Sequence, residues 1–332
     1  MDHRCTYALY NGVNMPLFTA KSSGKTIAIV DVENGTVGTG LVHLSAHSSP
    51  QFFAEKRIPF PYKEQVHGAA LLAHAEQSVQ EGLLHISEVA ARIRLHPSLN
   101  INADIERILF FLGAPWSEFM ISAPQEYRTV APRILTTKLK RLGAQQFDGV
   151  SVSFHTSSVA TANTMALFYP NETSALCIVN GELSELIVHQ GERILGRATF
   201  PTGTRTIDRT LQVHAGMRPN EVTSALQLSP AYLSETLAVV QDHFLEQLYV
   251  VARSLVEEGK VKHFFIIAQE PYGEWLARAI ADSPAIASLC SGGGTVRVLR
   301  ASQFTPYFQA KNERSDVMLL LEALFACSMH RV

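Results

Sequence analysis

Cysteine is scarce in this chain. Of 332 residues only four are cysteine, at positions 5, 177, 290 and 327, and no two of them form a Cys-x-x-Cys pair. The sequence therefore contains no pattern typical of a zinc ribbon or a thioredoxin-type redox site. Cys177 and Cys327 lie within apolar runs, which predicts reduced thiols packed in a core. We expect a folded protein that needs no disulfide framework.

Long apolar runs are also missing. The longest, residues 317–327, is interrupted by Glu322 and is too short to cross a bilayer. Residues 1–25 lack the apolar core of a signal peptide. These absences predict a cytoplasmic protein. The last apolar run is expected to form a helix that covers the core, and the alternative is a helix lying at a membrane surface as an anchor.

The charge of the chain is close to balanced. Lys and Arg number 28, Asp and Glu number 30, and the formal net charge is −2. Because the two signs are interspersed, the sequence gives poor support for a surface that binds nucleic acid or an anionic membrane. Hydrophobic residues make up 46% and charged residues 17%, as in an ordinary folded protein with a sizeable core. The length predicts two lobes.

Several catalytic and metal-binding patterns are absent as well. The glycine-rich run at residues 291–295 has no Walker lysine and leads into an apolar segment, so it is interpreted as a turn. No Gly-x-Ser-x-Gly elbow occurs. The thirteen histidines include close pairs such as His43 with His47 and His67 with His74, but none has a Cys or Glu at ligand spacing. We expect scattered histidines rather than a zinc site.

The pattern that is present is a repeated one. Three short apolar strands occur near the start and three more after the midpoint, and each group is followed by helices, the long ones beginning near residues 66 and 230. This repetition predicts an α/β protein with a duplicated plan. The expected strands are residues 27–32, 38–44 and 52–58 in the first group, and 175–179, 183–189 and 194–200 in the second.

The first strand ends in an acidic residue. Residues 26–30 are mostly apolar, Asp31 follows, and small residues around Gly35 lead into the next strand. An aspartate in this place can position a metal-bound or nucleophilic water, and a glycine lets backbone N–H groups approach a phosphate. The local alternative is an ordinary hairpin whose corner uses Asn34 and Gly35 for positive φ. Taken alone, the local pattern favours the hairpin.

Three segments in a fixed order resemble the actin-like ATPase superfamily. The stretch at 26–38 resembles its first phosphate loop, which has a pattern near Asp-x-Gly-x-x-Ser/Thr. The stretch at 175–201 resembles the second phosphate hairpin, and 263–276 resembles the adenosine loop. The chain looks most like the FtsA-like and PilM-like members of cell division and type IV pilus assembly. The resemblance implies an actin-like (ribonuclease H-like) duplicated two-lobe fold with a small inserted α+β subdomain.

The resemblance also implies domain boundaries. Residues 1–25 would be an N-terminal extension, and residues 26–66 and 130–172 the first lobe. Residues 67–129 would form the inserted subdomain with its leading long helix, and residues 173–332 the second lobe.

The chain departs from the superfamily pattern at each of the three loops. Glu33 stands at a glycine position of the first loop, and Ile178 stands where the second loop has an aspartate that helps to hold Mg²⁺. In the third loop the glycines are replaced by Ala268, Gln269 and Glu270. A carboxylate facing a phosphate in a partly buried cleft costs about a few kcal/mol at an effective dielectric near 20. We therefore predict a catalytically silent pseudo-ATPase that needs no cofactor.

The expected function is that of a soluble scaffold. It would bind a partner peptide in type IV pilus assembly or cell division, reach the inner face of the membrane through that partner, and bind no nucleic acid; self-association is a further option. The alternative is an active polymerising ATPase or small-molecule kinase that uses Mg²⁺ and ATP. In that case Asp31 would hold the metal and Glu182 or Glu185 would position water. The nucleotide would bind at Asp31, Gly35, Thr36, Gly181 and Ser184.

Overall fold

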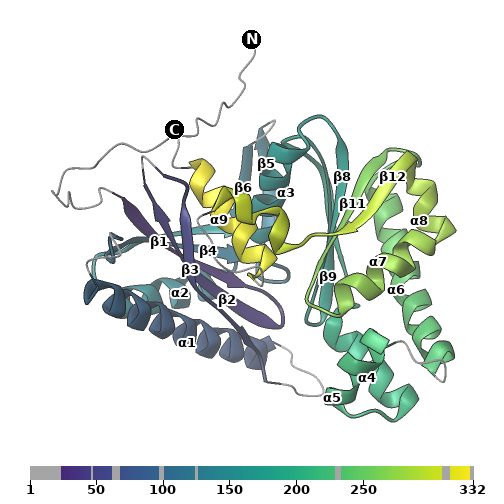
Figure 1. Ribbon diagram of the computed structural model, residues 1–332, viewed down its shortest axis with the longest axis horizontal. Helices are drawn as coiled ribbons and strands as arrows, with labels where there is room; N and C mark the ends of the chain where they lie inside the picture. Colours follow the sequence, from purple (N-terminus) through teal and green to yellow (C-terminus); the bar gives the residue numbers. More distant parts are fainter. Residues whose placement is uncertain are drawn as a thin grey trace, which may run out of the picture.

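The first lobe is built on a five-stranded mixed sheet (Figure 1). The computed structural model describes residues 24–45, 48–61, 68–96, 101–123, 126–228, 233–308 and 315–329. The sheet has the order β3-β2-β1-β4-β7, with β1 antiparallel to β2, β2 antiparallel to β3, and β4 parallel to both β1 and β7. Its strands are β1 (Lys25–Val32), β2 (Thr36–Leu44), β3 (Gln51–Pro59), β4 (Ile105–Leu112) and β7 (Ser151–Thr156).

The second lobe repeats this plan. Its sheet has the order β10-β9-β8-β11-β12, again with three antiparallel strands followed by two parallel ones. The strands are β8 (Thr173–Asn180), β9 (Leu183–Gln190), β10 (Arg193–Phe200), β11 (Val261–Ala268) and β12 (Cys290–Val298). The duplicated α/β plan expected from the sequence is confirmed. The glycine-rich run interpreted as a turn lies within β12, where its pairing with β11 shifts register.

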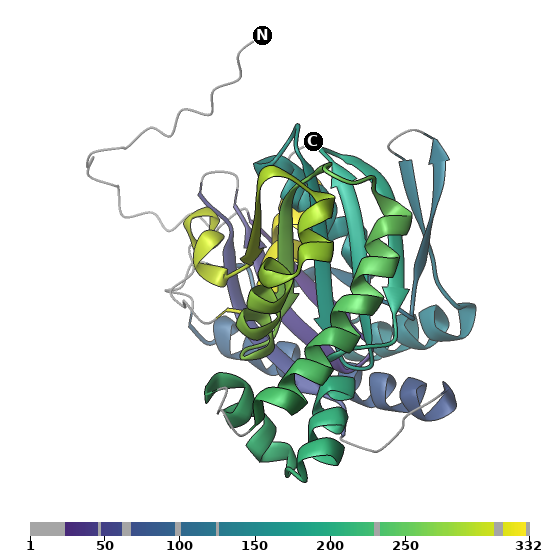
Figure 2. The same ribbon diagram turned by 90° about the vertical axis from the view of Figure 1, so that its right-hand side faces the viewer.

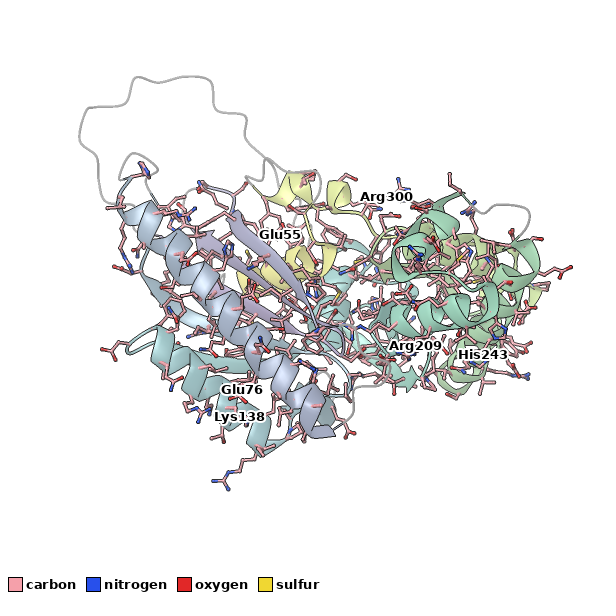
Figure 3. All side chains as sticks on the ribbon, turned by 90° about the horizontal axis from the view of Figure 1, so that it is seen from below. Glu55, Glu76, Lys138, Arg209, His243 and Arg300 are labelled. Carbon is pink, nitrogen blue, oxygen red and sulfur yellow. The ribbon has the colours of Figure 1, made fainter. Side chains whose placement is uncertain are left out.

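Helices cover the outer face of each sheet (Figures 1 and 2). In the first lobe, α1 (Gly68–Arg94) packs on β1, β2 and β3, and α2 (Arg133–Gln146) lies beside it, where Glu76 accepts hydrogen bonds from Lys138 and Arg141 (Figure 3). The second lobe carries α4 (Thr204–Ala215), α5 (Pro219–Leu228), α6 (Ser234–Leu255), α7 (Tyr272–Asp282) and α8 (Pro284–Leu289). No helix in the described ranges is long and apolar enough to cross a membrane.

Two helices lie between the sheets. α3 (Ser157–Phe168) and α9 (Val317–Met329) pack against each other, and one hydrophobic core joins them to residues of both sheets, such as Ile29 and Ile267. α9 is apolar on nearly all sides, which is typical of a buried helix. It follows the second lobe in the chain, after the short 3₁₀ turns Ala301–Gln303 and Thr305–Tyr307, yet it contacts α3, β1 and β2. The last helix of the region expected to form the second lobe, residues 173–332, therefore lies between the two sheets.

The inserted segment is smaller than expected. β4 lies in the first sheet between β1 and β7, and α1 packs on that sheet, so residues 67–129 do not form a separate subdomain. What projects is a two-stranded hairpin of β5 (Glu118–Ala123) and β6 (Glu126–Val130). Among the described strands, these two pair only with each other, in antiparallel order.

Candidate functional site

Asp31 ends β1 on the face that looks toward the space between the sheets. Ile27 and Ile29, which share that face because side chains alternate along a strand, belong to the inner core. Asp31 is fully buried, and the guanidinium of Arg57 on β3 donates to it with Nη2 2.8 Å from Oδ2. Gly38 on β2 lies between the two in the sheet, and a Cβ there would be 2.8 Å from Nη2 of Arg57. The missing side chain lets the arginine reach across the strand.

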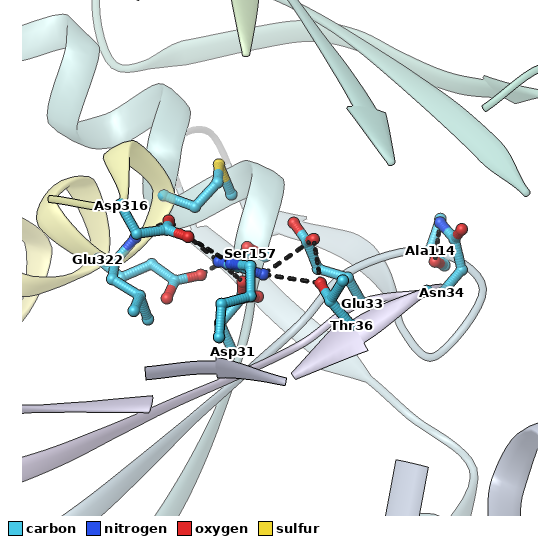
Figure 4. A network of polar contacts seen from close by, with 12 residues as sticks. Asp31, Glu33, Asn34, Thr36, Ala114, Ser157, Asp316 and Glu322 are labelled. Carbon is cyan, nitrogen blue, oxygen red and sulfur yellow. Dashed lines mark hydrogen bonds and ion pairs between the residues drawn. The ribbon is translucent and has the colours of Figure 1, made fainter. Parts of the chain in front are cut away.

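Arg57 also donates to Glu33, Thr36 and Asp316, three residues that Figure 4 labels around the cluster. Its Nη1 lies 3.2 Å from Oε2 of Glu33 and 2.9 Å from Oγ1 of Thr36, and its Nη2 lies 3.0 Å from Oδ1 of Asp316. Asp316 in turn caps α9, since its Oδ1 also accepts the Leu319 N–H at 3.2 Å. One largely buried guanidinium, with its side chain 13% exposed, thus connects the β1–β2 turn to the first turn of α9.

The same cluster contains more carboxylates than cations. Glu322 of α9 is fully buried and accepts a hydrogen bond from Ser157 at 2.6 Å. Burial raises the pKa of Asp31 to about 6, against the opposing attraction of Arg57. Burial, with repulsion from Asp31, raises the pKa of Glu33 and that of Glu322 well above the ordinary value. The cluster therefore retains protons toward neutral pH.

The two turns that resemble phosphate loops touch each other. A Cβ on Gly35 would lie 2.6 Å from Cα of Gly181, and a Cβ on Gly181 would lie 2.1 Å from Oδ1 of Asn34. Gly181 has φ of 38°, a left-handed conformation that favours glycine. The positive φ expected at Asn34 and Gly35 is not found. In the joint, the place where the β1–β2 turn meets the β8–β9 turn, the residue with positive φ is Gly181. Close approach, not backbone conformation, is what Gly35 supplies.

Asn34 joins the two turns. Its Oδ1 accepts the backbone N–H of Glu182 at 2.6 Å and that of Leu183 at 3.3 Å. Its Nδ2 lies 3.2 Å from the carbonyl oxygen of Ala114 and 3.5 Å from that of Leu183. The side chain of Arg205 at the start of α4 adds bonds to the carbonyl oxygens of Gly35 at 3.3 Å and Phe60 at 2.5 Å.

Little space is left where the turns meet. A void of about 10 Å³ lies between Glu33, Asn34, Ser157, Asn180 and Glu185, and a void of that size holds at most one water. A larger cleft of about 610 Å³ opens beside it, with Glu33 and Arg57 at one end. Its other walls are Asn180 at the end of β8 and residues 267–270, 298–302 and 315–318. The segment that resembles the adenosine loop therefore lines this cleft, and each phosphate-loop segment reaches it with one residue, Glu33 and Asn180.

All five residues predicted to bind nucleotide come together around this joint. Asp31 and Thr36 both bond Arg57, and Gly35 contacts Gly181. Ser184 is buried and donates to the Thr202 carbonyl at 2.6 Å. Each side chain or backbone is thus already engaged within the protein.

The two acidic residues expected to position water are paired with arginines. Glu182 forms an ion pair with Arg209, with Nη1 2.8 Å from Oε1, and Glu185 pairs with Arg197. Arg197 also donates to the carbonyl of Ser117 at 3.1 Å. Among the residues whose placement is described, no three acidic, His or Cys side chains are arranged to hold a metal ion.

Sequence reasoning missed Arg57 and Arg205. Arg57 had one available signal, because it occupies an inward position of a strand that is otherwise partly apolar. Arg205 had none beyond its place after a Thr-Gly pair at a helix start. Both are recognisable only once the strands and turns are assembled.

Comparison with solved structures places the fold. The PilM-PilN type IV pilus biogenesis complex matches with a TM-score of 0.59 and 10% identity, over 90% of this chain and 97% of that one. The ethanolamine utilization protein EutJ from Carboxydothermus hydrogenoformans matches with a TM-score of 0.52 and 11% identity, over 96% and 91% of the two chains. No protein-family model and no curated protein matches the sequence. At such identities the likeness shows the fold alone, which is the actin-like ATPase fold expected from the three loops.

Proposed function

We propose that this actin-fold chain is a scaffold that works without nucleotide and binds a protein partner. The observation that carries the proposal is the contact between the two turns. Asn34 bonds Glu182 and Leu183, Gly35 touches Gly181, and the remaining void is about 10 Å³. The phosphates of a nucleotide need room and free N–H groups at such turns, whereas here the void between the turns is too small for a phosphate and the N–H groups of Glu182 and Leu183 are already bonded to Asn34.

The charged groups support the same proposal. Arg57 lies beside Asp31, where a metal-bound water would have to sit, and Glu182 and Glu185 are each paired with an arginine. A carboxylate that positions water must have an oxygen directed at that water. Freeing Asp31 or Glu185 would break a largely buried ion pair, which costs several kcal/mol, whereas the more exposed pair of Glu182 with Arg209 would cost less. These ion pairs favour a role for the site in stabilising the fold rather than in hydrolysing a nucleotide.

The partner belongs to the proposal as well. A matched structure of the same fold was solved as a complex of PilM with PilN in type IV pilus biogenesis. By analogy we propose that this chain binds a peptide segment of a membrane-attached assembly protein, for pilus assembly or cell division, from the cytoplasmic side. A fold accommodates many functions, so this analogy needs its own test.

Nucleotide binding is tested by thermal unfolding with and without Mg·ATP. A ligand at 100 times its dissociation constant stabilises a protein by about 2.7 kcal/mol, which would raise the melting temperature by several degrees. We expect no shift at millimolar Mg·ATP, and none when EDTA replaces Mg²⁺. A shift that disappears with EDTA would refute the scaffold proposal.

Partner binding is tested by cross-linking in native extract followed by mass spectrometry. The expected product joins this chain to a protein of a cell-envelope assembly, and recovery of none would count against the proposal. Sedimentation of the purified chain over a range of concentrations tests self-association separately.

The cleft of about 610 Å³ favours a second candidate, an active ATPase or kinase of the same fold. It adjoins residues 268–270, which resemble the adenosine loop, and its volume is in the range of small-molecule sites. Glu270 lies in its wall, and its carboxylate, when ionised, disfavours an anionic ligand. Mg²⁺-dependent phosphate release that depends on Asp31 would establish this candidate.

A further inference from the structure

The β8–β9 turn forms a cradle for an oxygen atom. Its backbone N–H groups at Glu182 and Leu183 point to one place, as in the anion-binding concavities that successive N–H groups form. The oxygen in that place is Oδ1 of Asn34, 2.6 Å from the Glu182 nitrogen. The acceptor comes from a residue 148 positions earlier in the chain. The cradle is therefore filled from the other lobe.

The asparagine side chain is fully used in this contact. An amide oxygen accepts two hydrogen bonds and an amide nitrogen donates two. Oδ1 of Asn34 accepts from Glu182 and Leu183, and Nδ2 lies within reach of the carbonyls of Ala114 and Leu183. Asn34 is only 5% exposed. None of these partners lies in its own β1–β2 turn, so the side chain is not there to stabilise that turn.

Other contacts across the same joint also require the two lobes to be closed against each other. Arg205 of the second lobe donates to the carbonyls of Gly35 and Phe60 in the first. The contact between Gly35 and Gly181 leaves no room for a single Cβ on either residue. These contacts form only when the two turns meet, and Asn34 is the side chain that spans the gap between them.

We infer that Asn34 is a built-in ligand: its side-chain amide occupies the β8–β9 cradle and holds the two lobes closed without any bound molecule. Closure is then a fixed property of the folded chain. The inference rests on the same contact between the turns that carries the scaffold proposal. It is a different claim, because it concerns what holds the lobes together and not what the chain binds.

The test is hydrogen exchange with small-angle scattering on Asn34→Gly. Loss of the amide should speed exchange of the peptide containing Glu182 and Leu183 by about tenfold or more, since a buried N–H loses its acceptor. It should also enlarge the radius of gyration. The matched control is Asn102→Ala, which removes an amide bonded to Gly24 away from the joint and should leave the exchange of that peptide unchanged.

Chemical rescue of Asn34→Gly with acetamide tests whether the hydrogen-bonding amide of Asn34, and not only its bulk, holds the two turns together. Acetamide has the atoms that Asn34→Gly lacks, so at tens of millimolar it should restore slow exchange in the variant and leave the natural chain unaltered. If Asn34→Gly does not fold, Asn34→Asp is measured instead. It keeps the acceptor for Glu182 but places a charged oxygen against Ala114, so it should loosen residues 113–117 and keep Glu182 protected.

Unchanged exchange and scattering in Asn34→Gly would overturn the inference. So would faster exchange that acetamide does not reverse, and so would an Asn34→Asp variant that behaves as the natural chain does. The two failures are distinguishable: these outcomes would show that Asn34 does not hold the lobes, whereas a Mg²⁺-dependent shift of the natural chain with ATP would show that it binds nucleotide.

Discussion

Replacing Asp31 by Asn should change how the stability of this protein depends on pH. Asp31 is buried beside Arg57 and Glu322, and burial raises its pKa from 3.8 to about 6. Below pH 3.8 both the folded and the unfolded chain hold the proton. Between the two pKa values the unfolded chain releases it first, so the folded state loses stability as pH rises, and above pH 6 the loss is complete.

The size of this loss follows from the shift. One pKa unit is 1.36 kcal/mol, so a change from 3.8 to about 6 corresponds to about 3 kcal/mol. Asparagine resembles the protonated aspartic acid. Its oxygen can still accept from Arg57, and its nitrogen can donate to the carboxyl group of Glu322, which lies within hydrogen-bonding reach of Asp31. The free energy of unfolding of Asp31→Asn, relative to the natural chain, should therefore rise by about 2–3 kcal/mol from pH 4 to pH 8.

The assay is urea unfolding followed by the fluorescence of Trp116 and Trp275, both buried. Curves are measured at pH 4, 6 and 8 for the natural chain, for Asp31→Asn, and for Asp282→Asn at the exposed end of α7 as a control. Glu33 and Glu322 titrate together with Asp31, so the measured midpoint belongs to the group. A constant difference between Asp31→Asn and the natural chain at all three pH values would refute the reasoning.

Three other perturbations test the packing of the joint and the core. Gly181→Ala should lower the free energy of unfolding by more than about 2 kcal/mol, because Gly181 has φ of 38° and a Cβ there would lie 2.1 Å from Asn34. The control is Gly149→Ala, which should cost about 1 kcal/mol, because Gly149 has φ of 68° but open space around it. Urea titration measures both variants. Arg57→Met should cost about 3–5 kcal/mol by the same titration at pH 8, since it leaves buried carboxylates without their cation. Cys177, whose thiol pKa burial raises to about 12, should resist iodoacetamide at pH 8 in the folded chain and react in urea, as mass spectrometry of the labelled peptides would show.

The strands could be predicted from sequence because their signal is local. Alternating or continuous apolar runs bounded by turn residues located the two groups of three strands, and repetition gave the duplicated plan. The sheet position of β4 and the site of α9 could not be found in this way. Both depend on which apolar surfaces meet, and an apolar run does not specify its partner.

The sequence by itself determined that Asp31 ends a buried strand and that small residues turn the chain back into β2. Those properties follow from composition and periodicity over a few residues. The departures at Glu33, Ile178 and residues 268–270 were visible only through the resemblance to the loops of actin-like ATPases.

Only the tertiary structure decided what these residues do. Arg57 reaches Asp31 across Gly38, and Asn34 enters the turn at Glu182 from the other lobe, 148 residues away. A hydrogen bond requires its atoms to lie within about 3 Å of each other, and the packing of two sheets around α3 and α9 sets that distance. The sequence supplies the polar side chains, and the tertiary packing determines which of them come within hydrogen-bonding distance.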